Sequence, residues 1–131
     1  MEPSDAAAAS YVAVIEDDPV TREVMREILL DTGYAVTAWD GIRDIFDFIR
    51  QEPADLLIQD IRLGTGFSVW ELLDYIDTLR PGHVPRVLLC SADSAFLRSH
   101  RDALEARSCA IVEKPFDLEK LLQAVKEELQ S

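Results

Sequence analysis

The sequence predicts an α/β protein whose parallel sheet is covered by helices on both faces. Short apolar runs alternate with longer segments whose apolar residues recur at helical spacing, and five such pairs follow one another. The runs are continuously apolar, which is typical of strands buried on both faces. A length of 131 residues suits one domain, predicted over residues 11–131, after a disordered tail over residues 1–10.

The first strand is predicted at YVAVI, residues 11–15, and the first helix at residues 19–32. Asp18 precedes Pro19, a common helix start in which the aspartate accepts from free backbone N–H groups, and Gly33 is a stop signal. Four apolar residues of this helix form the stripe that we expect to face the core: Val20, Val24, Ile28 and Leu29.

The later elements follow the same pattern. Strands are predicted at YAVTAW (34–39), DLLIQ (55–59), RVLLC (86–90) and AIVE (110–113). Helices are predicted at residues 42–51, 69–79, about 95–106 and 118–129. Their apolar stripes include Ile42, Ile45, Phe46 and Ile49 in the second helix, and Leu118, Leu121, Leu122, Val125 and Leu129 in the last.

Composition indicates a soluble globular protein, with 48% hydrophobic and 29% charged residues. The net charge of -12 disfavours direct contact with nucleic acid or an anionic membrane. The chain has no apolar run of about 18 residues and no signal-peptide pattern at its start, so we expect a cytoplasmic protein. Cys90 and Cys109 match neither a disulfide framework nor a zinc spacing and are predicted to be buried thiols.

Polar residues at the strand ends form the candidate site, because parallel strands bring their carboxyl ends to one edge of the sheet. In chain order they are Glu16, Asp17, Trp39, Asp40, Asp60, Ser91 and Lys114. Carboxylate oxygens suit Mg²⁺, and an ammonium and a hydroxyl can hold the oxygens of a transferring phosphoryl group. A carboxylate can itself be the nucleophile.

Each of these residues also has an ordinary structural interpretation. Asp18 is sufficiently explained as a helix cap, Ser91 could start a turn, and Lys114 could be a solvated charge. Adjacent carboxylates at a strand end repel one another, however, and Glu16 and Asp17 cap nothing obvious. Their joint placement therefore points to a bound cation.

The motifs VAVIEDDP, ADLLIQDIRLG, VLLCSAD and IVEKPFD occur in the order and separation of a bacterial response-regulator receiver domain, which the chain resembles from Tyr11 to about Leu129. The resemblance implies a doubly wound, flavodoxin-like sheet of five parallel strands in the order 2-1-3-4-5, with five helices. It also implies a switch whose Asp60 accepts a phosphoryl group from a phosphohistidine of a sensor histidine kinase or phosphotransfer protein. Such a protein catalyses its own phosphoryl transfer and slow dephosphorylation but is otherwise not an enzyme.

The resemblance assigns roles to individual residues. Asp17, Asp60 and the backbone carbonyl of Arg62 would ligate Mg²⁺, and Glu16 would act through metal-bound water. Ser91 and Lys114 would contact phosphoryl oxygens, and the Lys114–Pro115 peptide bond is expected to be cis. Arg62 and Asp93 would modulate the rate at which water removes the phosphoryl group, and we expect their side chains to pair across the mouth of the site.

Three departures from the family pattern affect output. Ile111 occupies the switch position where an aromatic ring is common, so this position offers no ring whose rotamer could carry the signal. Cys109 and Ala110 replace residues that are often acidic in one dimeric DNA-binding subfamily, which disfavours that dimer. A glycine-rich stretch at 64–66 replaces a proline-containing loop and predicts a more flexible segment there.

Other functions remain open at this stage. A flavodoxin-like FMN carrier would be repelled by the acidic first loop, and a haloacid-dehalogenase phosphatase needs two aspartates separated by one residue, whereas Asp17 and Asp18 are adjacent. A phosphorylation-independent interaction module with the same fold is the main alternative. The expected partners are the kinase and a downstream protein, with a homodimer possible through the last strand.

Overall fold

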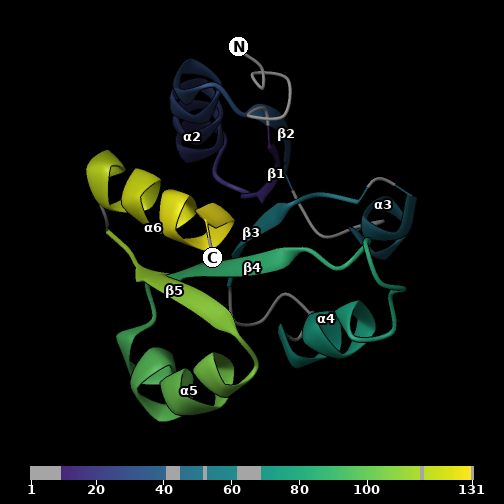
Figure 1. The fold of residues 1–131 in the computed structure, drawn as a ribbon. Helices are drawn as coiled ribbons and strands as arrows, with labels where there is room; N and C mark the ends of the chain where they lie inside the picture. The colour runs from purple at the N-terminus through teal and green to yellow at the C-terminus, as the bar shows by residue number, and fades with distance from the viewer. Residues whose placement is uncertain (1–9, 41–44, 52, 62–68, 116, 131) are drawn as a thin grey trace.

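The computed structural model describes residues 10–40, 45–51, 53–61, 69–115 and 117–130, although not the side chains of residues 45 and 46. Five parallel strands form one sheet in the order β2-β1-β3-β4-β5 (Figure 1). Their bounds are β1 Tyr11–Ile15, β2 Ala35–Trp39, β3 Leu56–Asp60, β4 Arg86–Ser91 and β5 Cys109–Glu113. The fold class and strand order predicted from the sequence are confirmed.

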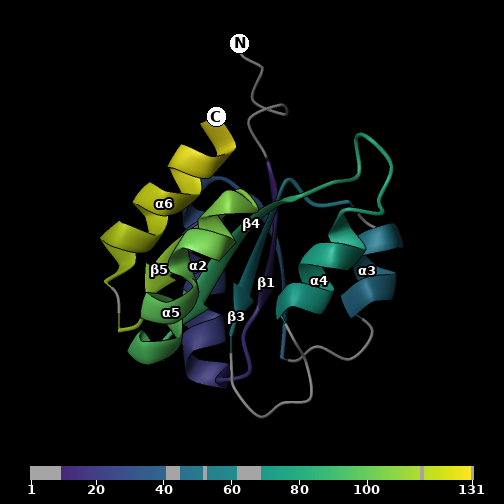
Figure 2. The ribbon, with the colours of Figure 1, turned by 90° about the horizontal axis from the view of Figure 1, so that it is seen from below.

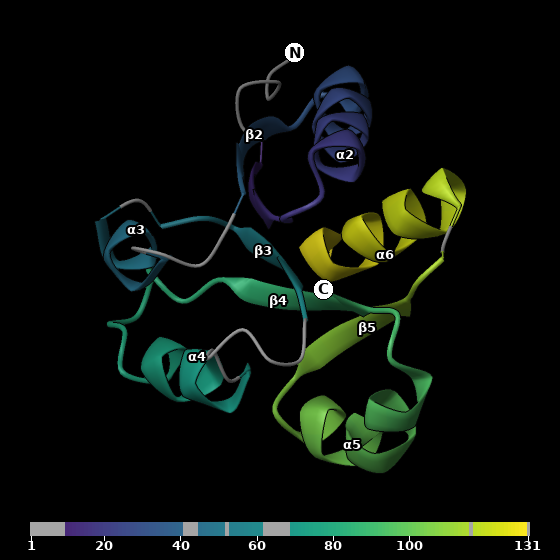
Figure 3. The same ribbon diagram turned by 180° about the vertical axis from the view of Figure 1, so that it is seen from behind.

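Helices cover both faces of this sheet. They are α2 (Pro19–Thr32), α3 (Ile45–Gln51), α4 (Val69–Ile76), α5 (Ser94–Ala106) and α6 (Leu118–Gln130). Figures 1 and 3 show α2 and α6 side by side, and Figure 2 shows α3 and α4 across the sheet from them. None of the helices in the described ranges combines the length and apolar composition that a membrane crossing requires.

The core has two layers, one on each face of the sheet. Ala13, Ile15, Leu57 and Leu89 point toward a layer completed by α3, α4 and α5, which contributes Leu104. Val12, Val14, Ile58 and Leu88 point toward α2 and α6. The alternation of side chains thus buries both faces of β1, β3 and β4, as their continuous apolar runs predict, whereas the edge strands β2 and β5 are mostly half-buried.

Helix α2 starts and stops where predicted. The side chain of Asp18 accepts from the backbone N–H of Thr21 at 3.0 Å, and Gly33 ends the helix at φ 111°, where glycine avoids the strain of a side chain. The predicted stripe is wrong in part, because Val20 is 71% and Val24 42% exposed. Met25 and Leu29 are buried instead, so the helix is rotated toward the next stripe of apolar residues.

The apolar stripes predicted for α6 and α3 can be compared with the observed burial of their residues. In α6, Leu121 and Val125 are fully buried and the remaining members are partly buried. In α3, Ile49 is buried together with Phe48. Ile42 and the side chains of Ile45 and Phe46 lie outside what the structure describes.

Candidate phosphoryl-acceptor site

Backbone hydrogen bonds join all five strands near their carboxyl ends. These run from Glu16 N–H to Trp39 O at 3.0 Å, from Ile61 N–H to Cys90 O at 2.7 Å, and from Lys114 N–H to Ser91 O at 2.8 Å. In each bond the donor is the first residue after its own strand, so the pairing of the sheet continues past the end of that strand. The residues predicted from the strand ends are therefore held at one rim by the sheet itself.

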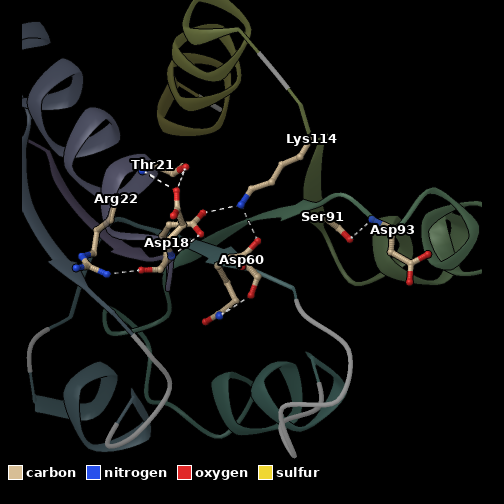
Figure 4. Close-up of polar contacts among 9 residues, drawn as sticks. Asp18, Thr21, Arg22, Asp60, Ser91, Asp93 and Lys114 are labelled. Carbon is tan, nitrogen blue, oxygen red and sulfur yellow. Dashed lines mark hydrogen bonds and ion pairs between the residues drawn. The ribbon is translucent and has the colours of Figure 1, made fainter.

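Lys114 links the first and third strand ends. Its Nζ lies 2.7 Å from Glu16 Oε1 and 3.0 Å from Asp60 Oδ1 (Figure 4). The Glu16 and Asp60 side chains are only 2% and 7% exposed, and that of Lys114 is 21% exposed. One ammonium thus neutralises part of the charge of two buried carboxylates.

Glu16 is fully engaged in this network. Besides Lys114, its Oε2 accepts from the backbone N–H of Asp18 at 3.2 Å, and its own carbonyl accepts from Arg22 Nη1 at 2.9 Å. Arg22 was not singled out from the sequence. Because both Glu16 carboxylate oxygens have donors, Glu16 is suited to support the site more than to ligate an ion directly.

The site also fits a divalent cation. Glu16, Asp17 and Asp60 each present a carboxylate oxygen, and these oxygens lie within 4.8 Å of one another. Asp60 Oδ2 is buried and has no hydrogen-bond partner among the described residues. Oxygen donors with excess negative charge are the donor set that Mg²⁺ takes, usually with one or two carboxylates and several waters.

Opposing effects act on the pKa values of Asp60 and Lys114. Burial raises the pKa of Asp60, and the charges of Glu16 and Asp17 act in the same direction, while Lys114 opposes them. Burial alone would lower the pKa of Lys114, but its hydrogen bonds to Glu16 and Asp60 outweigh this, and the pKa is raised. Lys114 therefore stays protonated, whereas an additional cation would favour the ionised form of Asp60.

Ser91 and Asp93 lie on the next part of the rim. The Ser91 hydroxyl accepts from the backbone N–H of Asp93 at 3.0 Å (Figure 4). The Asp93 side chain accepts from the backbone N–H of Phe96 at 2.8 Å. Asp93 is thus the N-cap of α5. Arg62, its predicted partner, lies outside the described residues, as do the glycines at 64 and 66.

The remaining predicted positions lie around this centre. The Lys114–Pro115 bond is cis, as expected. Ile111 is partly buried against the layer formed with α4 and α5. The Trp39 ring packs on Phe48 with centroids 4.1 Å apart, so it is a packing residue beside the first strand end, and Asp40 is exposed.

Both cysteines are buried, as predicted. Burial raises the pKa of the Cys90 thiol to about 12 and that of Cys109 to about 11. Both are therefore neutral near pH 7 and act as small apolar side chains.

One buried polar residue escaped the sequence analysis. Gln59 is 2% exposed, and its Nε2 donates to the backbone carbonyl of Asp60 at 2.9 Å. The signal was present in the sequence, because Gln59 is the single amide in the apolar run just before Asp60.

Comparison with known proteins agrees with this geometry. A family model described as a response regulator receiver domain matches residues 12–126. The chain belongs to the response-regulator receiver family. Receiver domains are signalling modules of two-component systems rather than classical enzymes.

Two of the curated relatives of this receiver are much larger proteins. It is 32% identical over 117 residues to the response regulator protein FleR of Pseudomonas aeruginosa, covering 89% of this chain and 24% of FleR. It is 29% identical over 117 residues to the DNA-binding transcriptional regulator NtrC of a Bradyrhizobium strain, with the same coverage of 89% and 24%. The chain thus spans about a quarter of the length of these relatives.

Solved structures share the receiver fold. A response regulator receiver domain protein (CheY-like) from Methanospirillum hungatei superimposes with a TM-score of 0.78 at 23% identity, covering 92% of this chain and 94% of the other. The receiver domain of a LuxO repressor protein from Vibrio parahaemolyticus gives 0.79 at 21% identity, with 92% and 90% covered. Identities this low support the fold alone.

Proposed function

We propose that this receiver is a phosphorylation-dependent switch in which Asp60 is the phosphoryl acceptor. The observation that carries the proposal is the Lys114 ammonium, held 3.0 Å from Asp60 Oδ1 and 2.7 Å from Glu16 Oε1 at the rim of the sheet. A partly buried lysine beside a nearly buried aspartate supplies both a nucleophile and a fixed positive charge for an incoming anion.

The donor is a phosphohistidine of a sensor histidine kinase or phosphotransfer protein. A carboxylate oxygen of Asp60 forms a bond to phosphorus while the phosphorus–nitrogen bond breaks, and the electron pair leaves with the imidazole. The product is an acyl phosphate on Asp60. Lys114 then holds phosphoryl oxygens, and the Ser91 hydroxyl, which accepts from the Asp93 N–H, donates its own hydrogen to another phosphoryl oxygen.

Mg²⁺ would be held by Asp17 and Asp60, with Glu16 acting through a bound water and, by the family resemblance, with the carbonyl of Arg62. When bound, the ion neutralises charge that would otherwise repel the phosphoryl group. The unpartnered Asp60 Oδ2 and the close carboxylate oxygens support this assignment.

Labelling tests the proposal. Incubation with acetyl phosphate and Mg²⁺ should add one phosphoryl group by mass, and Asp60→Asn should abolish it. The matched control is Asp40→Asn, which alters an exposed aspartate after the neighbouring strand β2 and should label normally. Labelling of Asp60→Asn, or of the wild type in chelator, would refute the site, and an unlabelled wild type would favour a phosphorylation-independent interaction module.

Output is proposed to reside in the loop after Ser91 and in α5, with a downstream protein as receptor. Ile111 offers no ring to rotate, and Ser91 connects directly to this helix through Asp93. Hydrogen exchange with and without beryllofluoride should change near α5 and β5. Changes confined to α3 would contradict this proposal.

Asp93 and Arg62 are proposed to set how long the phosphoryl group persists, by crowding the approach of water. Asp93 is committed to capping α5, so its charge acts from a fixed position at the start of that helix. The pairing of its carboxylate with Arg62 stays a prediction.

A further inference from the structure

The Gln59 side chain carries an energetic cost that packing does not explain. Its Oε1 is buried and has no hydrogen-bond partner among the described residues. The strand residues paired with it, Ile15 and Leu89, are apolar, and so is Leu57 on the same face. A buried amide oxygen without a donor destabilises the fold, whereas an apolar side chain of similar length would not.

The Gln59 amide nitrogen acts on the peptide unit that follows the acceptor residue. This unit consists of the Asp60 carbonyl and the Ile61 N–H. The carbonyl accepts from Gln59 Nε2 at 2.9 Å, and the N–H donates to Cys90 O at 2.7 Å. The peptide plane is therefore held on both sides.

The position of Gln59 explains why a side chain is needed here. The register of β1 with β3 ends at Ile15 opposite Gln59, while the register of β3 with β4 extends one pair further, to Asp60 opposite Cys90. The Asp60 carbonyl thus lies beyond the last pair formed with β1. The Gln59 amide thus donates to the Asp60 carbonyl in place of a backbone N–H from β1, at the residue whose carboxylate faces the site.

We propose that Gln59 is a positioning residue for phosphoryl transfer. By pinning the Asp60–Ile61 peptide plane it restricts the backbone rotation that would swing the Asp60 carboxylate away from Lys114. The inference rests on the proposed function of Asp60. Reacting groups held in one orientation react faster than groups that must first find it, so the effect appears in rate.

The test compares Gln59→Met, which keeps length and removes both polar atoms, with Leu57→Met, a matched control two residues earlier on the same face. Gln59→Met should lower the rate of labelling by acetyl phosphate at saturating Mg²⁺ by about three- to tenfold. Its urea midpoint should equal or exceed that of the wild type, because the orphan oxygen is gone. Although the variant is at least as stable, its Ile61 backbone amide should exchange hydrogen with solvent several-fold faster than in the wild type. Leu57→Met should leave the labelling rate and Ile61 exchange unchanged.

Two results would overturn the inference. One is wild-type labelling and wild-type Ile61 exchange in Gln59→Met. The other is a labelling loss that Leu57→Met shares in proportion to a lowered urea midpoint, since that would be a general packing effect. A wild type that is never labelled would refute the proposed function instead, and unchanged Ile61 exchange in Gln59→Met would then still overturn the positioning role.

Discussion

Replacing Lys114 by Met should destabilise the metal-free protein and strengthen its response to Mg²⁺. The change removes two charge-assisted hydrogen bonds, of 2.7 and 3.0 Å, to carboxylates that are 2% and 7% exposed. Such bonds are each worth about 1.5–3 kcal/mol. Because the Lys114 side chain is 21% exposed and water can enter, we expect a combined loss of about 2–4 kcal/mol.

Urea unfolding in chelator measures this loss. With a slope of about 2 kcal/mol per molar, the midpoint should fall by about 1–2 M. Mg²⁺ should then restore more stability to the variant than to the wild type, because the cation takes over the neutralising role of the ammonium. A tenfold gain in Mg²⁺ affinity corresponds to about 1.4 kcal/mol at saturation.

The control is Lys126→Met, which alters an exposed lysine on α6 and should change stability by less than about 0.5 kcal/mol. If Lys114→Met unfolds at the wild-type midpoint in chelator and gains no more than the wild type from Mg²⁺, the ammonium does not neutralise the buried acids as the distances indicate.

Three further predictions follow from individual contacts. Asp93→Ala should lower the free energy of unfolding by about 0.5–2 kcal/mol because it removes the α5 cap, whereas Asp93→Asn should keep the cap. Both variants should lose the phosphoryl group faster than the wild type. A wild-type rate of dephosphorylation in Asp93→Asn would exclude a role for the charge. Cys90 and Cys109 should resist alkylation at pH 8 until the protein unfolds. Burial raises their pKa values to about 12 and about 11, above the unfolded value of about 8.5, so the stability they contribute is complete below about pH 8.5 and is lost as the pH rises through the folded values. Replacing both cysteines by Ala should therefore reduce the loss of stability at alkaline pH. Rapid alkylation of the folded protein would contradict their burial. Met25→Ala should cost about 2–5 kcal/mol and Val24→Ala less than about 0.5, measured by urea unfolding, because only Met25 lies in the core; equal costs would contradict the observed rotation of α2.

Sequence patterns were sufficient to predict the strands and helices and to place several polar residues at one end of the sheet. Apolar periodicity is a local pattern, and it identified all five strands and the helices between them. Parallel pairing then brings the carboxyl ends of the strands together, so residues far apart in the chain could be assigned to one rim. Glu16, Asp17, Asp60 and Lys114 were found there.

The face that α2 turns toward the sheet could not be predicted from the sequence pattern. Helix α2 carries apolar residues on adjacent stripes, and periodicity does not distinguish Val20 and Val24 from Met25. Met25 and Leu29 belong to the core cluster that α2 forms with the sheet and α6, so docking selected this stripe. The choice depends on docking, which no window of sequence contains.

Partner choice among polar side chains was likewise decided only by the tertiary structure. Lys114 reaches Glu16 across 98 positions of the chain, Asp93 turns its carboxylate to the N–H of Phe96, and Gln59 turns its amide to the carbonyl of Asp60. A hydrogen bond requires two atoms to meet within about 3 Å at a favourable angle. Residue type and spacing along the chain state which atoms exist, but the folded backbone and its rotamers decide which of them meet.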